Sequence, residues 1–462
     1  MKPKHILALG LLALGLGSCG EGFFEQYPSN NITEGNFYKT DDDFNQGVVA
    51  CYAKLKTQMS FHLTEIGYRS DENVLESMAV STQDRYDIDH FAETPSNGIL
   101  SDIWNAWYNG IYRCNDVLDH MAGAKIANYD KYRGECLFMR SWWYFNLYRV
   151  FGVVPITRTV VAPAAAKLIP RCTEEEMYTL LTEDLAEAAR LLPSTPGAEK
   201  ARVANIAAYT LLAKVYLTFG KPAEAKTVLE EAMKNTAYGL ESTTKKAFDV
   251  GNKMNKEIIF ALYYNKTNDN GHGYWYSANT EVLADIRNPT PEFKAIYDGG
   301  KDNRLPLIGT YTKISSNLFA MTKWYDTYDA TYTTQVGNDF PHLRYADVVL
   351  MYAEALAESG GSLGDALVWL NKTRTRAGLD ELTTDEVKSL AEFRSELAAE
   401  RGREFALEGH RWFDLVRLGL AVDYFRGLGY TLDSHNLIFP IPQSQIEIVN
   451  NPSILWQNPG FN

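Results

Sequence analysis

Residues 203–232, which read VANIAAYTLLAKVYLTFGKPAEAKTVLEEA, carry the pattern that most restricts the fold of this 462-residue chain. Apolar and aromatic residues recur three and four positions apart on both sides of a Gly-Lys-Pro turn, which predicts two helices. Gly220 is suited to end the first helix, and Pro222 is suited to begin the second. The recurring positions are Tyr209, Leu212, Ala213 and Tyr216, followed by Ala225, Leu229 and Ala232.

Large residues alternate with small ones along both predicted helices, so the two helices can approach closely. This arrangement is typical of tetratricopeptide (TPR) hairpins, although Ala237 stands where a TPR unit often ends in proline. Two helices alone cannot bury their apolar faces, so the chain must supply further hairpins that stack on this one.

Other segments show the expected helical patterns. We predict TPR-like hairpins at about residues 101–156, 173–236 and 343–377, and one further long helix at 391–418. Ser101 is the expected cap of the first hairpin, and Thr173 with Glu176 forms a capping-box pattern for the second. An earlier helix is predicted to begin after Thr40 and to run to about Gln58, whereas residues 20–39 and the tail from Leu437 look extended.

Two segments lack helical periodicity, at about residues 61–97 and 237–341, and the second contains short alternating runs such as EIIFALYY. No Pro/Ser/Gly-rich linker separates the helical segments. The predicted fold class is therefore mostly α, with one body at residues 19–462. It is a TPR-like helical scaffold that carries two large irregular insertions with short strands.

The N-terminus predicts export and lipidation. Lys2, Lys4 and His5 precede an apolar run at residues 6–16 that is too short to span a bilayer as a mature helix. The run ends in Leu-Gly-Ser before Cys19, which resembles a bacterial lipobox, so residues 1–18 are the expected signal peptide and Cys19 the expected lipidation site. The acyl chains would hold the body at a membrane.

Charge and cysteine usage exclude several functional classes. The formal net charge is −13, and nucleic acid is not an expected partner because phosphate binding needs clustered basic residues. The remaining cysteines, which are Cys51, Cys114, Cys136 and Cys172, show no CxxC spacing. We therefore expect buried free thiols and no zinc site. No cofactor is expected, although a structural calcium ion in the Asp-rich turn at residues 268–271 stays open.

Acidic residues at spacings of four suggest a carboxylate pair of the kind that glycosidases use. The acids are Glu400, Glu404, Glu408 and Asp414, and the bases among them are Arg401, Arg403 and Arg411. Carboxylates on one stripe of one helix repel each other, whereas catalytic pairs flank a cleft from different elements. Since neighbouring arginines can neutralise the acids, we interpret the stretch as a structural ion-pair network and expect no enzyme. The HExxH pattern is absent from the sequence, and we expect no GxSxG nucleophile elbow.

Four segments together resemble the SusD/RagB family of nutrient-binding lipoproteins. They are RSWWYFNLYRVFGVVPI at residues 140–156, LRYADVVLMYAEAL at 343–356, AERGREFALEGHRWFDLVRLG at 399–419, and IFPIPQSQI with QNPGF near the C-terminus. The resemblance covers essentially the whole mature chain. It implies a TPR-helical scaffold at the cell outer membrane that caps a SusC-like TonB-dependent transporter. It also implies a non-catalytic protein that binds oligosaccharides, or sometimes peptides, and delivers them for import.

One departure from the family concerns surface display. Family members displayed outside the cell often carry a short acidic run after the lipidated cysteine, whereas here only Glu21 and Glu25 lie near Cys19. The sequence therefore supports lipidation more directly than it supports an outward-facing position.

Candidate ligand-binding residues are aromatic and polar side chains in the two insertions. Sugar rings present apolar C–H faces and polar edges, which aromatic rings beside polar groups can match. Loops on a rigid scaffold commonly carry such sites. From the second insertion we nominate Tyr274, Trp275, Tyr276, Trp324 and Tyr325. The family resemblance adds Arg69, Asp71 and Tyr86 from the first. The alternative function is a TPR adaptor that binds peptides or proteins in the concave face of the helical stack.

Overall fold

The computed structural model describes residues 37–73, 83–265, 277–278, 289–297, 300–308, 311–315, 318–324 and 337–461. The signal peptide, Cys19, Tyr274, Trp275, Tyr276 and Tyr325 lie outside these residues, as does the Asp-rich turn at 268–271. Among the helices that these ranges contain, none combines the length and the apolar character that a bilayer crossing requires.

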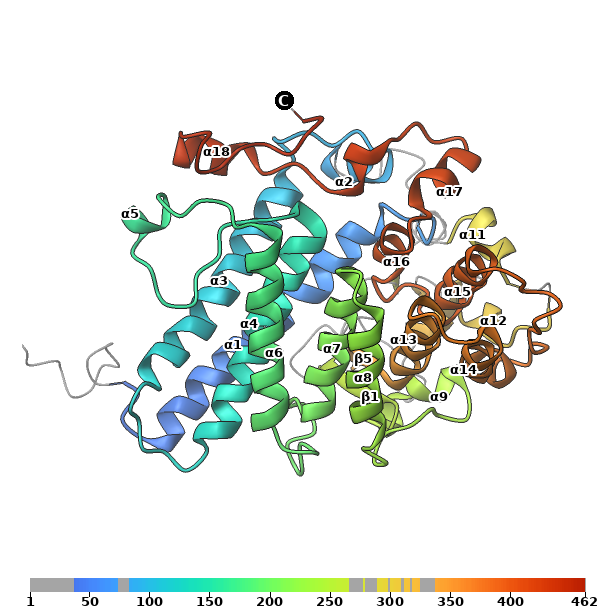
Figure 1. The fold of residues 1–462 in the computed structure, drawn as a ribbon, viewed down its shortest axis with the longest axis horizontal. Helices are drawn as coiled ribbons and strands as arrows, with labels where there is room; N and C mark the ends of the chain where they lie inside the picture. The colour runs from blue at the N-terminus through green and yellow to red at the C-terminus, as the bar shows by residue number, and fades with distance from the viewer. Residues whose placement is uncertain are drawn as a thin grey trace, which may run out of the picture.

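The described chain is mostly helical, and its main helices stack side by side in sequence order (Figure 1). The stack comprises α3 (Gly98–His120), α4 (Tyr129–Phe151), α6 (Glu174–Leu191), α7 (Asn205–Thr218), α8 (Pro222–Met233), α13 (Tyr345–Glu358), α14 (Leu363–Arg376) and α15 (Leu390–Glu404). Helix α8 packs on α13 although more than a hundred residues separate them. The chain therefore resumes the same stack after the second insertion, which confirms the predicted fold class.

The turns that join these helices have the expected chemistry. Gly220 has φ +67°, which a residue with a Cβ rarely adopts, and Pro222 begins α8. Thr173 and Glu176 form the predicted reciprocal capping box at the start of α6. Gly152 ends α4 with φ +72°. These local choices agree with the stacked arrangement of the helices.

The first hairpin packs closely because α3 has a glycine where it crosses α4. A Cβ atom placed on Gly110 would lie 2.2 Å from Cε2 of Trp143. Trp107 and Trp143 are fully buried beside this crossing, with ring centroids 6.4 Å apart. Helix α1 (Asp41–Gly67) packs against α3 and α4 and closes this end of the core.

Two predicted helix boundaries were wrong. Helix α1 begins after Thr40 as expected, but it continues through Gly67 instead of ending near Gln58. Helix α3 is capped by Asn97, whose side chain accepts a hydrogen bond from the backbone N–H of Leu100, so Ser101 lies within the helix. The first insertion is accordingly less irregular than predicted, since it contains the end of α1 and the short helix α2 (Gln83–Asp89).

The predicted long helix at residues 391–418 is broken. Helix α15 ends at Glu404 and helix α16 (Arg411–Arg417) starts in a new direction. Leu407 has φ +64° and Gly409 has φ +75°, so the backbone passes twice through the left-handed region and cannot continue a right-handed helix. Glu408 therefore does not share a helical face with Glu400 and Glu404.

The second insertion contains the predicted short strands. Strand β1 (Ile258–Leu262) pairs antiparallel with β5 (Phe340–Arg344), so the two ends of the insertion lie together beside α7. A second sheet has the order β2 (Ser277–Ala278), β4 (Leu318–Met321), β3 (Tyr311–Ser315). Two short helices precede β1, namely α9 (Thr244–Ala247) and η3 (Val250–Asn252). Three more lie between the strands, namely α11 (Pro291–Ala295), α12 (Leu305–Ile308) and η5 (Thr322–Trp324).

The C-terminal segment returns across the first hairpin, as the red ribbon along the top of Figure 1 shows. After α17 (Ala421–Gly427) and η6 (Ser434–Leu437), the backbone N–H of Phe439 donates to the Val150 carbonyl over 2.8 Å. The tail is not wholly extended as predicted, because α18 (Gln443–Val449) follows Pro442. The first and last parts of the described chain are thereby joined.

Candidate ligand-binding site

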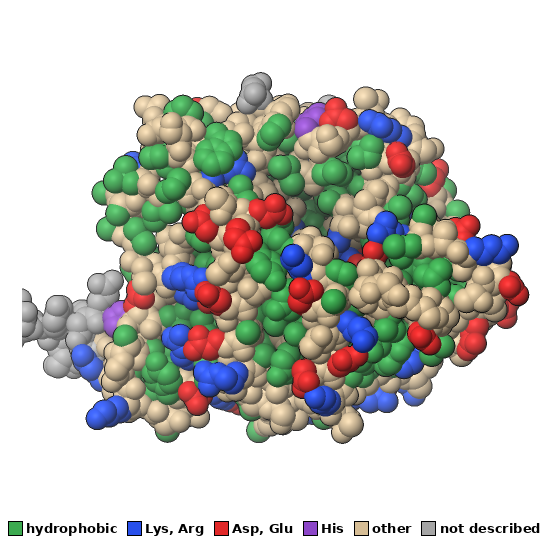
Figure 2. Space-filling view, viewed as in Figure 1, with side chains coloured by type: hydrophobic (Ala, Val, Ile, Leu, Met, Phe, Trp, Pro, Cys, Tyr) green, Lys and Arg blue, Asp and Glu red, His purple; other side chains and the backbone are tan. Residues whose placement is uncertain are grey.

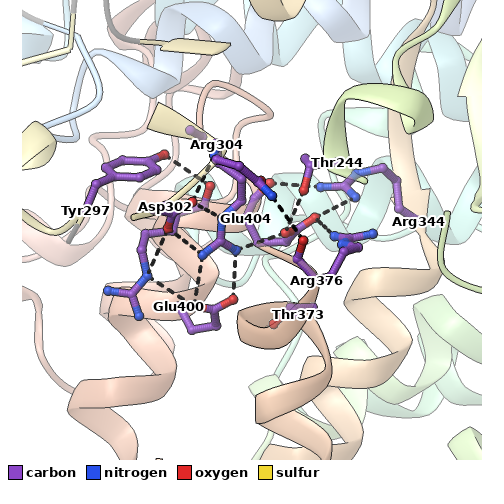
Figure 3. A network of polar contacts seen from close by, with 12 residues as sticks. Thr244, Tyr297, Asp302, Arg304, Arg344, Thr373, Arg376, Glu400 and Glu404 are labelled. Carbon is purple, nitrogen blue, oxygen red and sulfur yellow. Dashed lines mark hydrogen bonds and ion pairs between the residues drawn. The ribbon is translucent and has the colours of Figure 1, made fainter. Parts of the chain in front are cut away.

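A buried network of carboxylates and guanidinium groups surrounds Glu404 (Figure 3). Glu404 and Glu400 project from α15 toward Arg304, which donates to both carboxylates over 3.0 Å and 2.7 Å. Arg344 at the end of β5 and Arg376 at the end of α14 also contact Glu404. All of these side chains are at most 5% exposed, so the network ties four separate segments together inside the core.

The network confirms the interpretation of the acidic stretch as structural, and two of the three neighbouring arginines pair with acids of the stretch, Arg403 with Glu400 and Arg401 with Asp414. Arg401 contacts Asp347 and Asp414, and Arg411 contacts Asp71, so of the nearby arginines only Arg403 neutralises Glu400. The cations that neutralise Glu404 and Glu408 come from distant segments: Arg344 of β5 contacts both acids, and Lys323 of η5 contacts Glu408.

The lowered pKa of Glu404 also argues against a general-acid role for this carboxyl group. Burial would raise the pKa of Glu404, but Arg376, Arg344 and Arg304 hold it well below its usual range. A carboxyl group that stays ionised cannot donate a proton to a leaving group. The arrangement instead matches a set of paired buried charges, which hold segments in register.

Two residues nominated from the first insertion are buried in ion pairs, which corrects their nomination. Arg69 is fully buried, donates to Glu93 over 2.5 Å and lies between the rings of Phe91 and Phe439. Asp71 is 3% exposed and accepts from Arg411 over 2.9 Å. Both side chains therefore brace the first insertion against the C-terminal third of the molecule and do not face solvent.

Trp324 is buried as well. It is 1% exposed, and its ring lies 5.1 Å from Phe248 and 6.3 Å from Phe340, centroid to centroid. A side chain in this position stabilises the second insertion from within, so its nomination as a sugar-stacking residue is corrected. Tyr86 is half-buried on α2, with its ring stacked on His90 at 3.8 Å, and it remains a nominee.

A hollow of about 690 Å³ with exposed aromatic surface lies where α1, the α6–α7 loop and the end of β1 meet. We call it the tyrosine hollow. Its side-chain lining includes Val49, Tyr52 and Lys56 from α1, Lys200 and Arg202 from the loop, and Lys253, Met254 and Tyr263 near β1. Its volume falls within the range of small-ligand sites.

Tyr263 is the most prominent aromatic side chain of the tyrosine hollow. It is 46% exposed, and the Lys253 ammonium lies 4.2 Å from its ring centroid. Tyr52 is half-buried and accepts a hydrogen bond from the backbone N–H of Val203 over 3.1 Å, so its ring is held in place. Met254 has φ +49°, an unusual conformation for a residue with a long side chain.

The sequence predicted only part of the lining of this hollow. Tyr263 opens the aromatic-rich stretch in which Tyr274, Trp275 and Tyr276 were nominated, and these follow it in the chain outside the described residues. Tyr52 and Lys253 were missed. Tyr52 falls within the helix predicted after Thr40, and no local pattern indicated that residues 198–202 would lie opposite it.

A second, narrower hollow of about 380 Å³ lies between α4, α7 and α16. The face in Figure 2 is hollowed near its middle, where α7 and α16 lie in Figure 1. The walls of this second hollow include Arg149, whose guanidinium lies 3.9 Å from the Phe413 ring centroid. Lys214, also in the wall, is ion-paired with Asp347 over 2.5 Å. Burial lowers the pKa of Arg149 to about 9. The tyrosine hollow is roomier and carries the exposed aromatic ring.

Comparison with known proteins identifies the family. Residues 305–461 match the model of the SusD family, and residues 27–217 match a second SusD-like model described as "starch-binding associating with outer membrane". The two matches span both ends of the helical stack. The chain belongs to the SusD/RagB family. This membership confirms the resemblance found in the sequence.

Individual SusD-like proteins match along nearly the whole chain. SusD-like protein P2 of Formosa agariphila is 26% identical over 511 residues, which cover 99% of this chain and 100% of the relative. A SusD superfamily protein from Bacteroides vulgatus has a TM-score of 0.78 at 23% identity, over 92% of this chain and 100% of that chain. A laminarin-binding SusD-like protein has a TM-score of 0.75 at 24% identity, over 92% and 100%. These structures share the SusD fold with this chain.

Proposed function

We propose that this protein is an outer-membrane lipoprotein that binds oligosaccharides at the cell surface and delivers them to a SusC-like TonB-dependent transporter. The observation that carries the proposal is membership of a family with a matching model described as starch-binding and associated with the outer membrane. The laminarin-binding neighbour of the same fold supports a glycan as the ligand class.

The tyrosine hollow offers the contacts that a sugar needs. The exposed face of Tyr263 can stack on the C–H face of a pyranose ring, and the surrounding ammonium and guanidinium groups can donate hydrogen bonds to its hydroxyl groups. A few such contacts correspond to dissociation constants on the order of micromolar to millimolar. Weak binding suits a protein that must pass its ligand on. Tyr274, Trp275, Tyr276 and Tyr325 remain proposed contacts in the insertion that begins beside this hollow.

Anchoring and orientation complete the proposal. Acylation of Cys19 would tether the body through residues 20–36, and the helical stack would face the transporter while the insertions face the glycan. The protein would act as a receptor and not as an enzyme. The paired state of Glu400, Glu404 and Glu408 supports this part of the proposal.

Native affinity electrophoresis of the purified mature protein, in gels that each contain one polysaccharide, tests glycan binding. We expect one glycan class to retard the protein without release of new reducing ends. Tyr263→Ala should weaken that retention about tenfold, which corresponds to about 1.4 kcal/mol. Tyr112→Ala is the matched control, because Tyr112 is 45% exposed on α3 and lies outside the hollow.

The outcomes separate the candidate functions. Unchanged mobility in every gel would overturn glycan binding and favour the peptide-binding adaptor, whereas new reducing ends would indicate a hydrolase. Equal losses of glycan retention in the Tyr263→Ala and Tyr112→Ala variants would mean that the binding site is not the tyrosine hollow.

A further inference from the structure

The loop between α4 and α6 exposes an apolar surface to solvent. Residues 160–170, which read VVAPAAAKLIP, contain one basic side chain and no acidic one, and none of them is buried. The short helix α5 (Pro163–Ala166) lies within this run, and Leu168 is 70% exposed. We call residues 160–170 the apolar tip. Single exposed apolar residues are common on protein surfaces, whereas a continuous run of them marks a contact surface.

Both ends of the apolar tip are fixed to the body of the protein. The backbone N–H of Val160 donates to the Asp119 carboxylate on α3 over 2.7 Å. Just after the tip, the backbone N–H of Arg171 donates to the Ile454 carbonyl over 3.0 Å. The run is therefore held away from the core as a structured projection.

Backbone groups within the apolar tip pair with one another. The N–H groups of Ala165 and Ala166 both donate to the Ala162 carbonyl over 2.9 Å, and that of Leu168 donates to the Ala165 carbonyl over 3.0 Å. Unpaired backbone groups make contact with an apolar medium costly. Because these amides are already paired, the tip can enter the interfacial region of a bilayer at low cost.

The apolar tip projects from the end of the helical stack at which the proposed lipid tether enters. Tyr38 donates to Asp116 over 2.8 Å, and its ring stacks on His120 with centroids 4.5 Å apart. Asp119, which holds Val160, belongs to the same end of α3. In Figure 1 the blue start of the described chain and α5 both lie at the left, whereas α14 lies at the right.

The length of the tether keeps this end of the molecule near the membrane. Residues 20–36 connect Cys19 to Phe37, and even a fully extended chain of that length spans at most about 60 Å. Acylation of Cys19 would thus place the apolar tip within reach of the bilayer surface. Tethering raises local concentrations to the order of millimolar, so a few weak contacts are sufficient.

A second exposed apolar segment lies beside the apolar tip. Trp456 is 41% exposed, its carbonyl accepts from Arg171 over 2.8 Å, and its ring centroid lies 4.9 Å from the Arg171 guanidinium. Ile448 on α18 is exposed as well. Figure 2 shows apolar side chains gathered where α5 and α18 lie in Figure 1. Tryptophan and lysine beside apolar residues are typical of segments at a bilayer surface, and Lys167 supplies the lysine.

We propose that the apolar tip contacts the lipid surface to which the protein is anchored. This inference rests on the lipid anchor in the proposed function and names the part of the body that meets the membrane. Leu168 and Val160 enter the interfacial region, and Lys167 reaches the lipid phosphates. The acyl chains supply most of the membrane affinity. The tip determines the orientation, with the first hairpin nearest the bilayer and α14 farthest from it.

Site-specific fluorescence of the lipidated, full-length mature protein in phospholipid vesicles tests the contact. The cysteines that the structure describes are free and buried, so a thiol-reactive nitrobenzoxadiazole dye labels an introduced cysteine. Ala165→Cys places the dye on the apolar tip. Val368→Cys, at a residue that is 61% exposed on α14, places it at the other end of the stack. Nitroxide-labelled lipids should quench the dye at position 165 at least about twofold more strongly than the dye at position 368.

A second variant tests the apolar contact itself. In protein labelled at position 165, Leu168→Glu should lower the quenching at least about twofold, because a carboxylate resists transfer into the bilayer interface. Val368→Glu is the matched control and should leave the quenching unchanged. Leu168 is exposed and lies outside the tyrosine hollow, so Leu168→Glu should fold and should keep the glycan retention of the wild type.

Three results would overturn the proposal, and they differ in what they mean for the proposed function. Equal quenching at positions 165 and 368 in membrane-bound protein would exclude the contact and leave the glycan receptor intact. Shielding of the dye at position 165 in native outer membranes, but not in lipid vesicles, would assign the apolar tip to a protein partner. Failure of the lipidated protein to bind vesicles would overturn the anchor in the proposed function, and the contact with it.

Discussion

At the scale of single residues, buried ionisable side chains, some charged and some neutral, join distant segments of this protein. Glu72, which lies outside the network of Figure 3, is one such side chain. It is 2% exposed, and its carboxyl accepts the backbone N–H of Leu407 over 3.0 Å, at the turn that breaks the predicted long helix. Burial, with a smaller contribution from Asp71, raises the pKa of Glu72 to about 8.

The raised pKa of Glu72 predicts a pH-dependent stability. Between about pH 4.5 and 8 the folded protein holds a proton that the unfolded chain has released, so the free energy of unfolding falls as pH rises through this window. Glu72→Gln keeps a neutral acceptor and removes this contribution. We expect the variant to gain about 2 kcal/mol relative to the wild type between pH 6 and pH 8. Urea unfolding at each pH measures the difference.

Glu381→Gln, at an exposed glutamate, is the control for that pH series. Its difference from the wild type should stay constant across the same range. Parallel profiles for the wild type and Glu72→Gln would show that Glu72 is ionised in the folded protein.

Residue-scale patterns predicted which residues belong to the insertions but not which of them face solvent. Trp324 was nominated because it follows a polar, aperiodic stretch, yet it packs against Phe248 and Phe340, which lie far from it in sequence. Arg69 and Asp71 were nominated from the family resemblance, yet both are buried in ion pairs with Glu93 and Arg411. In each case, contacts with residues that are distant in the sequence bury the side chain, and the local sequence does not indicate those contacts.

At the scale of helices and strands, the sequence predicted the ends of helices correctly where a glycine, a proline or a capping residue at that position determines the end. The Gly220–Pro222 turn, the Thr173 capping box and the end of α4 at Gly152 follow from the residues themselves. The break after Glu404 was missed because it depends on Leu407 in a left-handed conformation, which tertiary contacts such as that with Glu72 hold in place. Helical periodicity continued through that turn in the sequence.

The approach of α3 to α4 predicts that Gly110 cannot be replaced. Alanine favours helices over glycine by about 1 kcal/mol, but a methyl group at this position would lie 2.2 Å from Trp143. Overpacking of this kind costs roughly 1–3 kcal/mol or more. We therefore expect Gly110→Ala to lower the free energy of unfolding, as measured by urea titration.

Two comparisons make this prediction specific. Gly427→Ala, in helix α17 with nothing within 4 Å of the added Cβ, should be neutral or slightly stabilising. In the Gly110→Ala/Trp143→Phe double variant, the smaller ring should recover part of the lost stability. A Gly110→Ala variant as stable as the wild type would mean that the two helices can separate without cost.

At the scale of the whole molecule, contacts between the ends of the described chain make the helical stack and the insertions one body. Asp71 from the first insertion binds Arg411 and Tyr424, and Arg69 donates to the Asn436 carbonyl. Near the C-terminus, Asn458 donates to the carbonyls of Phe151 and Phe439 over 2.9 Å and 2.7 Å. Its side-chain oxygen also accepts from Arg171 over 2.7 Å. The lack of a linker in the sequence predicted one body, but it did not indicate these contacts.

These contacts between the two ends of the described chain predict that the molecule unfolds cooperatively. Asn458 is 1% exposed, so Asn458→Ala leaves two carbonyl groups and a guanidinium nitrogen with fewer partners and should cost about 2–4 kcal/mol. Because α4 and the C-terminal segment depend on each other, we expect the whole transition to shift to lower temperature without splitting. Calorimetric and van't Hoff enthalpies should agree in both proteins.

The exposed Asn109 on α3 supplies the control, since Asn109→Ala should shift the transition by much less. A repeat stack held together only by neighbouring helices would instead unfold in segments, because each repeat contacts only the next. If Asn458→Ala separated the thermal transition into two, the C-terminal segment would be an appendage of the stack. A single shifted transition would mean that this segment completes the scaffold on which the insertions and the tyrosine hollow are held.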